Sequence, residues 1–213
     1  MRDDLPEGSS HHLPDGARRT GRMVLITGGA RSGKSTFAER LAMASGKEVI
    51  YVATCMPQDE EMQQRVEEHR RRRPPAWRTR EEPFHPGRAM REEDSPGRCF
   101  ILDCLTLFLS NHLCSALGVG IGPGDPCDAI ENTRMTSAEA VEVVMREARQ
   151  LAQTVRKLSA DALVVTNEVG MGLVPEWPLG RLFRDLAGRV NQEFAGLADE
   201  VYAMFCGLPL RVK

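Results

Sequence analysis

Short apolar runs alternate with amphipathic stretches along most of the chain. Five runs rich in β-branched residues have the length of strands buried in a sheet, and they lie at 23–27, 49–54, 99–106, 162–166 and 201–205. Apolar residues spaced three or four apart predict helices between these runs, beginning near Thr36 and covering 105–117, 138–160 and 181–197. Alternating strands and helices predict an α/β fold with a mostly parallel sheet flanked by helices.

Four further segments have weaker patterns. Residues 59–73 begin with acids, end with bases and are followed by two prolines, which predicts a helix with a thin apolar face. Residues 77–83 are expected to be extended, and 84–98 to form an irregular or short helical connection. Residues 208–212 are expected to pair with the last strand as a hairpin.

Two segments lack a periodic apolar pattern. Residues 1–22 are charged and contain Pro6, Pro14 and the pair His11-His12, so we expect a disordered tail. The stretch from Gly118 to Pro126 is rich in glycine and proline and is expected to be a loop. The remaining chain has the length of one domain, so residues 23–213 are predicted to form a single domain.

Composition narrows the class of protein. The formal net charge is −2, which provides no basic field for nucleic acid, and no apolar run approaches the ~20 residues of a membrane span. The cysteines form no C-x-x-C pairs, and the chain starts without an apolar signal segment, which together favour a reducing, cytoplasmic setting. The cysteines are Cys55, Cys99, Cys104, Cys114, Cys127 and Cys206.

The first strand is followed by a phosphate-binding motif of the form G-x-x-x-x-G-K-[ST]. Its glycines allow backbone N–H groups to approach phosphates closely, and the helix that follows points its positive end at the same anion. Lys34 is expected to reach the β- and γ-phosphates, and the Ser35 hydroxyl to ligate Mg²⁺. The residues of the motif are Gly28, Gly29, Ala30, Arg31, Ser32, Gly33, Lys34 and Ser35.

Other strands end in polar or small residues. Because the carboxyl ends of parallel strands face the ligand, Ala53, Thr54 and Cys55 are predicted to line the nucleotide site. Asp103 has the position of a Walker B carboxylate that helps to hold Mg²⁺, although a strand-end cap explains it equally well. The pair Asn167-Glu168 is expected to point toward the same rim.

The charged segment 59–73 has two interpretations. A solvated surface helix with internal ion pairs accounts for its composition. Alternatively, helical spacing places Arg65, His69 and, if the last turn persists, Arg73 on one side, where an imidazole nitrogen attacks phosphorus while guanidinium groups stabilise the transferring charge. The pattern by itself does not choose between them.

Several strings together resemble one family, the bifunctional adenosylcobinamide kinase / adenosylcobinamide-phosphate guanylyltransferase of cobalamin biosynthesis. The resemblance extends over residues 23–213 outside the loops, and the strings beginning at Asn167 and Gly188 are much more specific than the phosphate loop. It rests on Ile26 to Ser35, Tyr51 to Thr54, Arg65 to His69, Arg73-Pro74, Trp77 to Thr79, Glu81, Thr166 to Pro175 and Arg184 to Gln192.

The resemblance implies two reactions at one site. A nucleoside triphosphate, ATP or GTP, phosphorylates the aminopropanol hydroxyl of adenosylcobinamide, and GTP then transfers GMP to that phosphate through a guanylylated His69. It also implies a homotrimer, a RecA-type P-loop core, Mg²⁺, and small molecules rather than nucleic acid as partners. Besides the phosphate loop, the positions that correspond to nucleotide contacts are Ala53, Thr54, Cys55, Arg70, Arg71, Arg72, Arg73, Glu81 and Asp103.

Two other functions remain open at this point. A simple P-loop kinase for a small molecule needs no nucleotidyl-histidine, and His69 is then structural. A GTP-dependent switch module is the other, although the chain lacks an Asn-Lys-x-Asp string for guanine and Asn167-Glu168 resembles one only in part. The tail before Met23 and the loop 118–126 match none of the family strings, and the run of arginines from Arg70 is more basic than those strings require.

Overall fold

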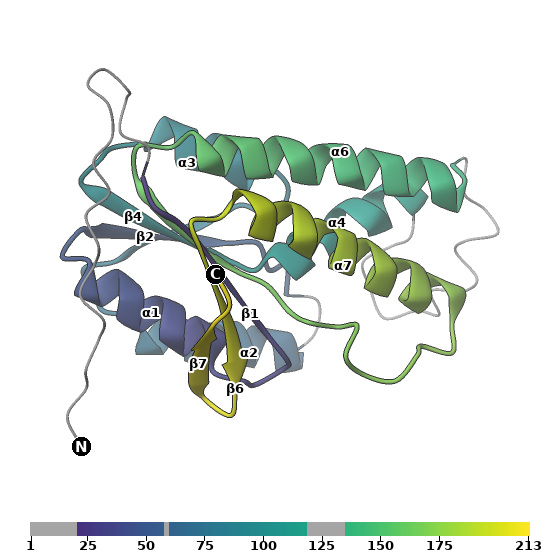
Figure 1. The fold of residues 1–213 in the computed structure, drawn as a ribbon, viewed down its shortest axis with the longest axis horizontal. Helices are drawn as coiled ribbons and strands as arrows, with labels where there is room; N and C mark the ends of the chain where they lie inside the picture. Colours follow the sequence, from purple (N-terminus) through teal and green to yellow (C-terminus); the bar gives the residue numbers. More distant parts are fainter. Residues whose placement is uncertain (1–20, 58–59, 119–134) are drawn as a thin grey trace.

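Seven strands form one sheet in the part of the chain that the structure describes, which is residues 21–57, 60–118 and 135–213 of a computed structural model (Figure 1). The strands are β1 (Met23–Gly28), β2 (Glu48–Ala53), β3 (Arg78–Glu81), β4 (Arg98–Asp103), β5 (Asp161–Val165), β6 (Glu200–Phe205) and β7 (Leu208–Arg211). The helices are α1 (Lys34–Ala44), α2 (Glu60–Arg72), α3 (Pro86–Glu92), α4 (Leu105–Leu117), α6 (Ser137–Arg156) and α7 (Pro178–Leu197).

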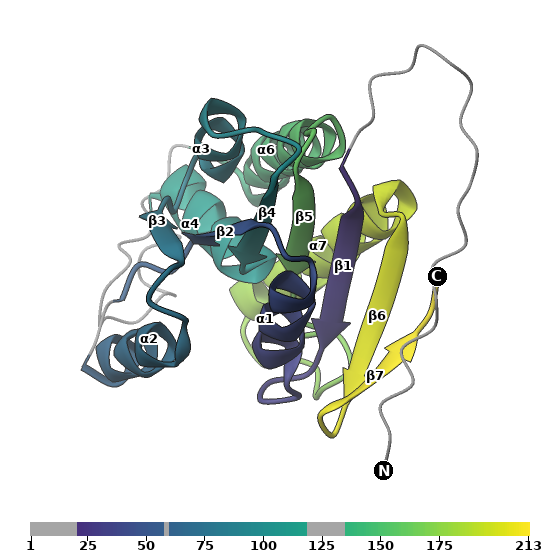
Figure 2. The same ribbon diagram turned by 90° about the vertical axis from the view of Figure 1, so that its left-hand side faces the viewer.

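The sheet has the order β3-β2-β4-β5-β1-β6-β7, which Figure 2 shows from one side of the molecule to the other. Every neighbouring pair is parallel except β6 and β7, which are antiparallel. The predicted α/β fold with a mostly parallel sheet flanked by helices is therefore confirmed. The six parallel strands point in the same direction, so their carboxyl ends lie together at one end of the sheet. The phosphate loop lies at this end, after β1.

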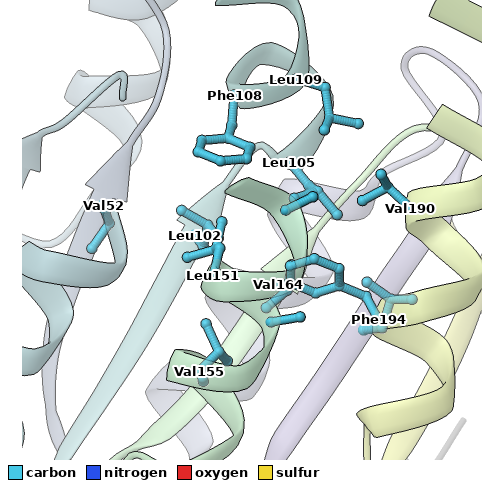
Figure 3. Close-up of a cluster of buried hydrophobic side chains, with 14 of the residues drawn as sticks. Val52, Leu102, Leu105, Phe108, Leu109, Leu151, Val155, Val164, Val190 and Phe194 are labelled. Atoms are coloured by element: carbon cyan, nitrogen blue, oxygen red, sulfur yellow. The ribbon is translucent and has the colours of Figure 1, made fainter. Parts of the chain in front are cut away.

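Helices cover both faces of the sheet. In Figure 1, α3, α4, α6 and α7 lie on one face and α1 on the other. The larger core cluster packs under the first group, and Figure 3 shows strand residues such as Leu102 and Val164 beside Phe108 and Phe194. A smaller cluster, which includes Phe37 of α1, fills the space below α1.

The predicted apolar faces of the long helices are largely confirmed. Leu105, Leu109 and Leu113 of α4 are buried, as the spacing of four predicts. Val190 and Phe194 of α7 are also buried. The helix boundaries differ by a few residues, since α6 ends at Arg156 and α7 already begins at Pro178, whose fixed φ suits a first turn. None of the helices in the described ranges is long and apolar enough to cross a membrane.

The structure contains one strand that the sequence pattern did not predict. Residues 77–83 were expected only to be extended, yet β3 pairs in parallel with β2 from Ile50 to Ala53. All four of its side chains are exposed, so no apolar alternation marks it as a strand. Residues 200–205 thus form the sixth strand of the sheet rather than the fifth.

The predicted tail ends two residues too late. The Gly21 amide donates to the carbonyl of Leu158, and Arg22 bonds Asp161 and Glu200. These contacts tie both residues to the domain. The rest of the predicted tail and loop residues 119–126 lie outside the described residues.

The predicted hairpin at the end of the chain is confirmed, and its turn touches the phosphate loop. β6 and β7 are joined by Cys206 and Gly207, which have φ values of +50° and +83°. The Gly207 amide donates to the carbonyl of Ser32 at 3.0 Å. The hairpin thereby contacts the phosphate loop from the end of the sheet formed by β6 and β7, far from β3 in the strand order.

Candidate active site

Two glycines of the phosphate loop occupy positions that other residues fit poorly. Gly28 has φ +148°, and a Cβ there would lie 2.8 Å from both the Met204 carbonyl oxygen and Ser32 Oγ. Gly33 precedes α1 with φ +95°, in the left-handed region that favours glycine. The tight course of the loop thus depends on glycine at both positions.

The loop presents unpaired polar groups. Within the described residues, the amides of Lys34 and Ser35 make no hydrogen bond, as is usual for the first turn of a helix. The hydroxyl of Ser32 is buried and also lacks a partner there. Unpaired donors at a helix N-terminus form an anion-binding site, so the predicted phosphate cradle has the geometry that it requires.

Lys34 lies inside this cradle. Its Nζ donates to the Gly29 carbonyl at 2.6 Å, and its side chain is buried. Burial lowers the pKa of Lys34 from its usual value, while the nearby Cys104 and Asp103 act in the opposite direction. A bound phosphate would supply the counter-charge that a buried ammonium group needs.

Asp103 lies at the end of β4, next to the site of Lys34. Its Oδ2 accepts a hydrogen bond from Tyr51, and Oδ1 has no hydrogen-bond partner in the described ranges. The same ranges contain no group of three or more His, Cys, Asp or Glu side chains suited to a metal ion. One hydroxyl and one carboxylate fit Mg²⁺ in the manner of P-loop sites, where phosphate and water oxygens complete the shell.

Tyr51 is buried in β2 and contacts two predicted site residues. Its hydroxyl donates to Asp103 Oδ2 at 2.5 Å, and Cζ of Arg73 lies 3.4 Å from the centroid of its ring. Burial, reinforced by the Asp103 carboxylate, raises the pKa of Tyr51 well above its usual value. The phenol therefore remains a protonated donor, although the sequence suggested no role for it.

Three of the four predicted arginines connect the C-terminal end of α2 to other elements. Arg70 forms an ion pair with Glu81 of β3. Arg72 donates to Thr36 Oγ1 at 2.8 Å and to Glu39 at 3.3 Å, both on α1. Arg73 donates to Thr79 Oγ1 at 3.2 Å and stacks on Tyr51. The end of α2 is thus held beside the first turn of the phosphate-loop helix.

Arg71 is the arginine that the structure does not bring to the site. Its guanidinium pairs with Glu67 one turn earlier on the same helix, and the side chain is 79% exposed. Its position matches the interpretation of a solvated, ion-paired helix face. A basic run of four residues therefore does not act as one unit.

His69 is half-buried on α2, with its Nδ1 atom buried and without a hydrogen-bond partner in the described residues. An imidazole whose Nδ1 is shielded presents Nε2 as the nitrogen that a ligand can approach. His69 and Arg73 are both half-buried, although Arg73 follows the last residue of α2. The side chain of Arg65 is outside what the structure describes.

A broad cavity of about 770 Å³ opens between the end of α2 and β3. It combines guanidinium groups, two carboxylates and an indole, which suits a planar, polar and anionic ligand. Its lining residues are Arg70, Arg73, Pro74, Pro75, Trp77, Thr79, Arg80, Glu81 and Glu82.

The predicted residues after β2 have different environments. Ala53 lies in register between Asp103 of β4 and Glu81 of β3, so it connects the two parts of the site. Cys55 is half-buried, and burial together with these two carboxylates raises the pKa of its thiol. Thr54 is fully buried and donates to the Cys104 carbonyl at 2.7 Å, so its hydroxyl stabilises the strand ends rather than lining the site.

A polar network at the end of β5 was not among the predicted site residues. Glu168 accepts hydrogen bonds from Thr27 at 2.8 Å and from Asn191 at 3.0 Å, and its amide donates to the Gly28 carbonyl. Asn167 donates to Thr106 at 2.6 Å. The bond from the Glu168 amide to Gly28 puts the pair beside the phosphate loop, and its expected orientation toward the phosphate rim stays a prediction. The signal for Asn167 and Glu168 was their position at a strand end, whereas their partner Asn191 was marked only by the family string that begins at Gly188.

Thiol reactivity gives a test of the loop's surroundings. Cys206 is exposed beside the phosphate loop, whereas burial raises the pKa of Cys99 to about 12 and that of Cys104 to about 11. At pH 8 the Cys104 thiolate fraction is therefore about a hundredfold below that of an unshifted thiol. Among the cysteines that the structure describes, we expect iodoacetamide to modify Cys206 first, and bound GTP to slow that reaction, as followed by peptide mass spectrometry. Cys206→Ser is expected to remove the fast phase among these cysteines, and early labelling of Cys104 in the folded protein would contradict the assignment.

The parallel sheet, the glycine loop with its unpaired donors and the lysine define a P-loop nucleotide-binding protein of the α/β class. Residues 24–212 match the family described as cobinamide kinase / cobinamide phosphate guanyltransferase. The bifunctional adenosylcobalamin biosynthesis protein CobU of Escherichia coli K12 is 40% identical over 191 residues, which cover 90% of this chain and 99% of that protein. CobP of Pseudomonas aeruginosa is 40% identical over 189 residues, covering 89% and 96%. The chain belongs to the cobinamide kinase / cobinamide phosphate guanyltransferase family.

Solved structures with a similar arrangement are more distant. The RadB recombinase has a TM-score of 0.42 and 14% identity, with coverage of 87% of this chain and 74% of that one. The flagellar accessory protein FlaH of Methanocaldococcus jannaschii has a TM-score of 0.41 and 15% identity, covering 92% and 79%.

Proposed function

We propose that this protein phosphorylates adenosylcobinamide with a nucleoside triphosphate and then transfers GMP from GTP to the phosphate through a guanylylated His69. The observation that carries the second half is the attachment of α2, because Arg72 on that helix bonds Thr36, the residue that follows Ser35. His69 is thereby held on the same side of the sheet as the phosphate loop. Family membership supports both halves together.

In the kinase reaction, the aminopropanol hydroxyl oxygen attacks the γ-phosphorus, the bond to the β-phosphate oxygen breaks, and a nucleoside diphosphate leaves. The hydroxyl proton is released to water. The loop amides and Lys34 bind the phosphates and stabilise the charge that develops on the transferring group. Ser35 and Asp103 would hold a Mg²⁺ ion that neutralises part of the triphosphate charge. Besides Asp103, Glu168 is a second carboxylate residue close to the phosphate loop, because its amide donates to the Gly28 carbonyl.

In the guanylyl reaction, His69 Nε2 attacks the α-phosphorus of GTP, and pyrophosphate leaves as the N–P bond forms. A phosphate oxygen of adenosylcobinamide phosphate then attacks the same phosphorus, and the N–P bond breaks to regenerate the imidazole. Arg73, which lies four residues from His69, would stabilise the charge on the α-phosphate. The product is adenosylcobinamide-GDP.

The cavity beside β3 is the proposed site of the guanine base and ribose. Glu81 offers a carboxylate that accepts hydrogen bonds from a base carrying adjacent N–H donors, as guanine does. Trp77, on the same wall, offers an aromatic face for stacking. These features support GTP rather than ATP as the nucleotidyl donor.

The wider setting of the protein follows from its family. We propose a homotrimer in the cytoplasm with small-molecule substrates, Mg²⁺ and no nucleic acid partner. Exposed apolar side chains after β5, among them Met171, Leu173 and Trp177, are available for contacts between subunits.

Incubation with Mg²⁺ and GTP labelled at the α-phosphate tests the proposal. We expect an acid-labile, alkali-stable label on the protein that adenosylcobinamide phosphate removes, and transfer of γ-label to adenosylcobinamide in a separate reaction. A kinase of one function would give γ-transfer without protein label. GTP binding with neither transfer would favour the switch module and overturn the proposal.

A further inference from the structure

Helix α2 has little apolar anchorage to the domain. None of its described side chains is fully buried, and neither hydrophobic cluster contains a residue of this helix. Polar and cation–π contacts of the arginines at and just after its C-terminal end tie it to α1, β3 and β2. Such a contact fixes the position of a helix only if the partner residue is itself rigidly packed.

The contacts differ in their surroundings. The pair Arg70–Glu81 is more than half exposed on both sides, so water and salt weaken it. Arg72 is also 43% exposed, although its partner Glu39 is buried. Only Arg73 reaches a buried aromatic ring, since Tyr51 is 2% exposed. A guanidinium on a desolvated ring face is a stronger contact than an exposed ion pair.

The same tyrosine holds Asp103. Among the described residues, the Tyr51 hydroxyl is the hydrogen-bond donor to the Asp103 carboxylate. Asp103 lies at the end of β4, the strand next to β2. Ring and hydroxyl belong to one rigid group packed in the sheet. A shift of the ring therefore changes the positions of Asp103 and of the helix carrying His69 together.

We propose that Tyr51 is a positioning residue that fixes the Asp103 carboxylate through its hydroxyl and the His69 helix through its ring. This proposal rests on the proposed function. It takes Asp103 to hold Mg²⁺ in both the kinase and the guanylyl reaction, and α2 to carry the nucleophile of the guanylyl reaction. The two parts of the side chain are separable by substitution. Removal of the hydroxyl affects both reactions, and removal of the ring affects guanylylation most.

Two substitutions of Tyr51 test this division. For Tyr51→Phe we expect the Mg²⁺ concentration for half-maximal rate to rise about tenfold in both reactions, the usual effect of losing a hydrogen bond to a charged group. Hydrogen exchange of the ligand-free α2 amides is expected to remain as in the wild type. For Tyr51→Leu we expect the same change in Mg²⁺ dependence, at least about fivefold faster exchange in α2, and a larger loss of guanylylation than of kinase activity.

The matched control is Tyr202→Phe. Tyr202 is the other tyrosine of the chain, and its hydroxyl also donates to a carboxylate, that of Glu200 at 2.7 Å. We expect wild-type Mg²⁺ dependence and exchange. Because Tyr51→Leu alters the core, Arg73→Ala provides a second way to break the ring contact, and it should accelerate α2 exchange to the same extent.

Two results would overturn the proposal. One is Mg²⁺ dependence of Tyr51→Phe equal to that of Tyr202→Phe, and the other is unchanged α2 exchange in both Tyr51→Leu and Arg73→Ala. If wild-type protein acquires no label from GTP, the proposed function fails, whereas the exchange measurements on the ligand-free protein still decide whether Tyr51 anchors the helix.

Discussion

His69→Ala is expected to abolish the protein label from α-labelled GTP and to lower GMP transfer by at least about 10³-fold. The reason is chemical, because alanine has no nitrogen to form the bond to the α-phosphorus. Phosphorylation of adenosylcobinamide is expected to stay within about threefold of wild type, since that step needs no nucleotidyl-histidine. Parallel assays with α- and γ-labelled GTP measure the two outcomes in one preparation.

The controls for this variant use the same residue type. His69→Gln retains a polar side chain of similar size without a nucleophilic nitrogen, so it should lose the label as alanine does. His85→Ala changes an exposed histidine that precedes α3 and should label normally. Equal labelling of wild type and His69→Ala would remove His69 from the mechanism. Because Nδ1 of His69 has no hydrogen-bond partner in the described ranges, we expect little change in the free energy of unfolding.

Lys34→Met is expected to lower kcat/KM of both reactions by about 10²- to 10³-fold, the effect of removing one charge-stabilising donor from a water-poor site. Both reactions suffer because the same ammonium group contacts the triphosphate in each. The thermal midpoint should not fall, since burial already disfavours the charged form of Lys34 in the ligand-free protein. Steady-state kinetics and calorimetry measure the two effects.

Lys47→Met is the matched control for Lys34. Lys47 pairs with Asp161 at 2.9 Å, at the start of β5 and thus at the edge of the sheet opposite to the phosphate loop. Both activities should remain at wild-type values. Loss of only one activity in Lys34→Met would contradict the single shared phosphate site.

The central strands and the phosphate loop were predictable because their signals are local. The loop glycines, Lys34 and the flanking strand and helix lie within a short stretch of chain, and their roles follow from backbone geometry. Asp103 was also identified, as an acid at the end of an apolar strand. In contrast, all four side chains of β3 are exposed, and the strand forms because it pairs with β2. No local sequence pattern predicts that pairing.

The arginines of α2 show where local reasoning ends. Four consecutive arginines are equivalent in sequence, yet Arg71 points to Glu67 while Arg73 stacks on Tyr51. The difference arises from the rotation of the helix, which partners far away in the chain determine. The thin apolar face of α2, Met62 and Val66, is half-buried like His69, so periodicity indicated the side that faces the domain but not which contact each arginine makes.

The sequence by itself determined the class of fold, the phosphate cradle and the strand ends that carry Asp103, because each depends on residues close together in the chain. Only the tertiary structure decided which charged side chains of α2 reach the site, that β3 completes its wall, and that Tyr51 contacts both Asp103 and Arg73. The physical reason is that these arrangements depend on contacts between strands and helices that are distant in sequence. A hydrogen bond and a cation–π contact leave no periodic pattern from which they can be predicted.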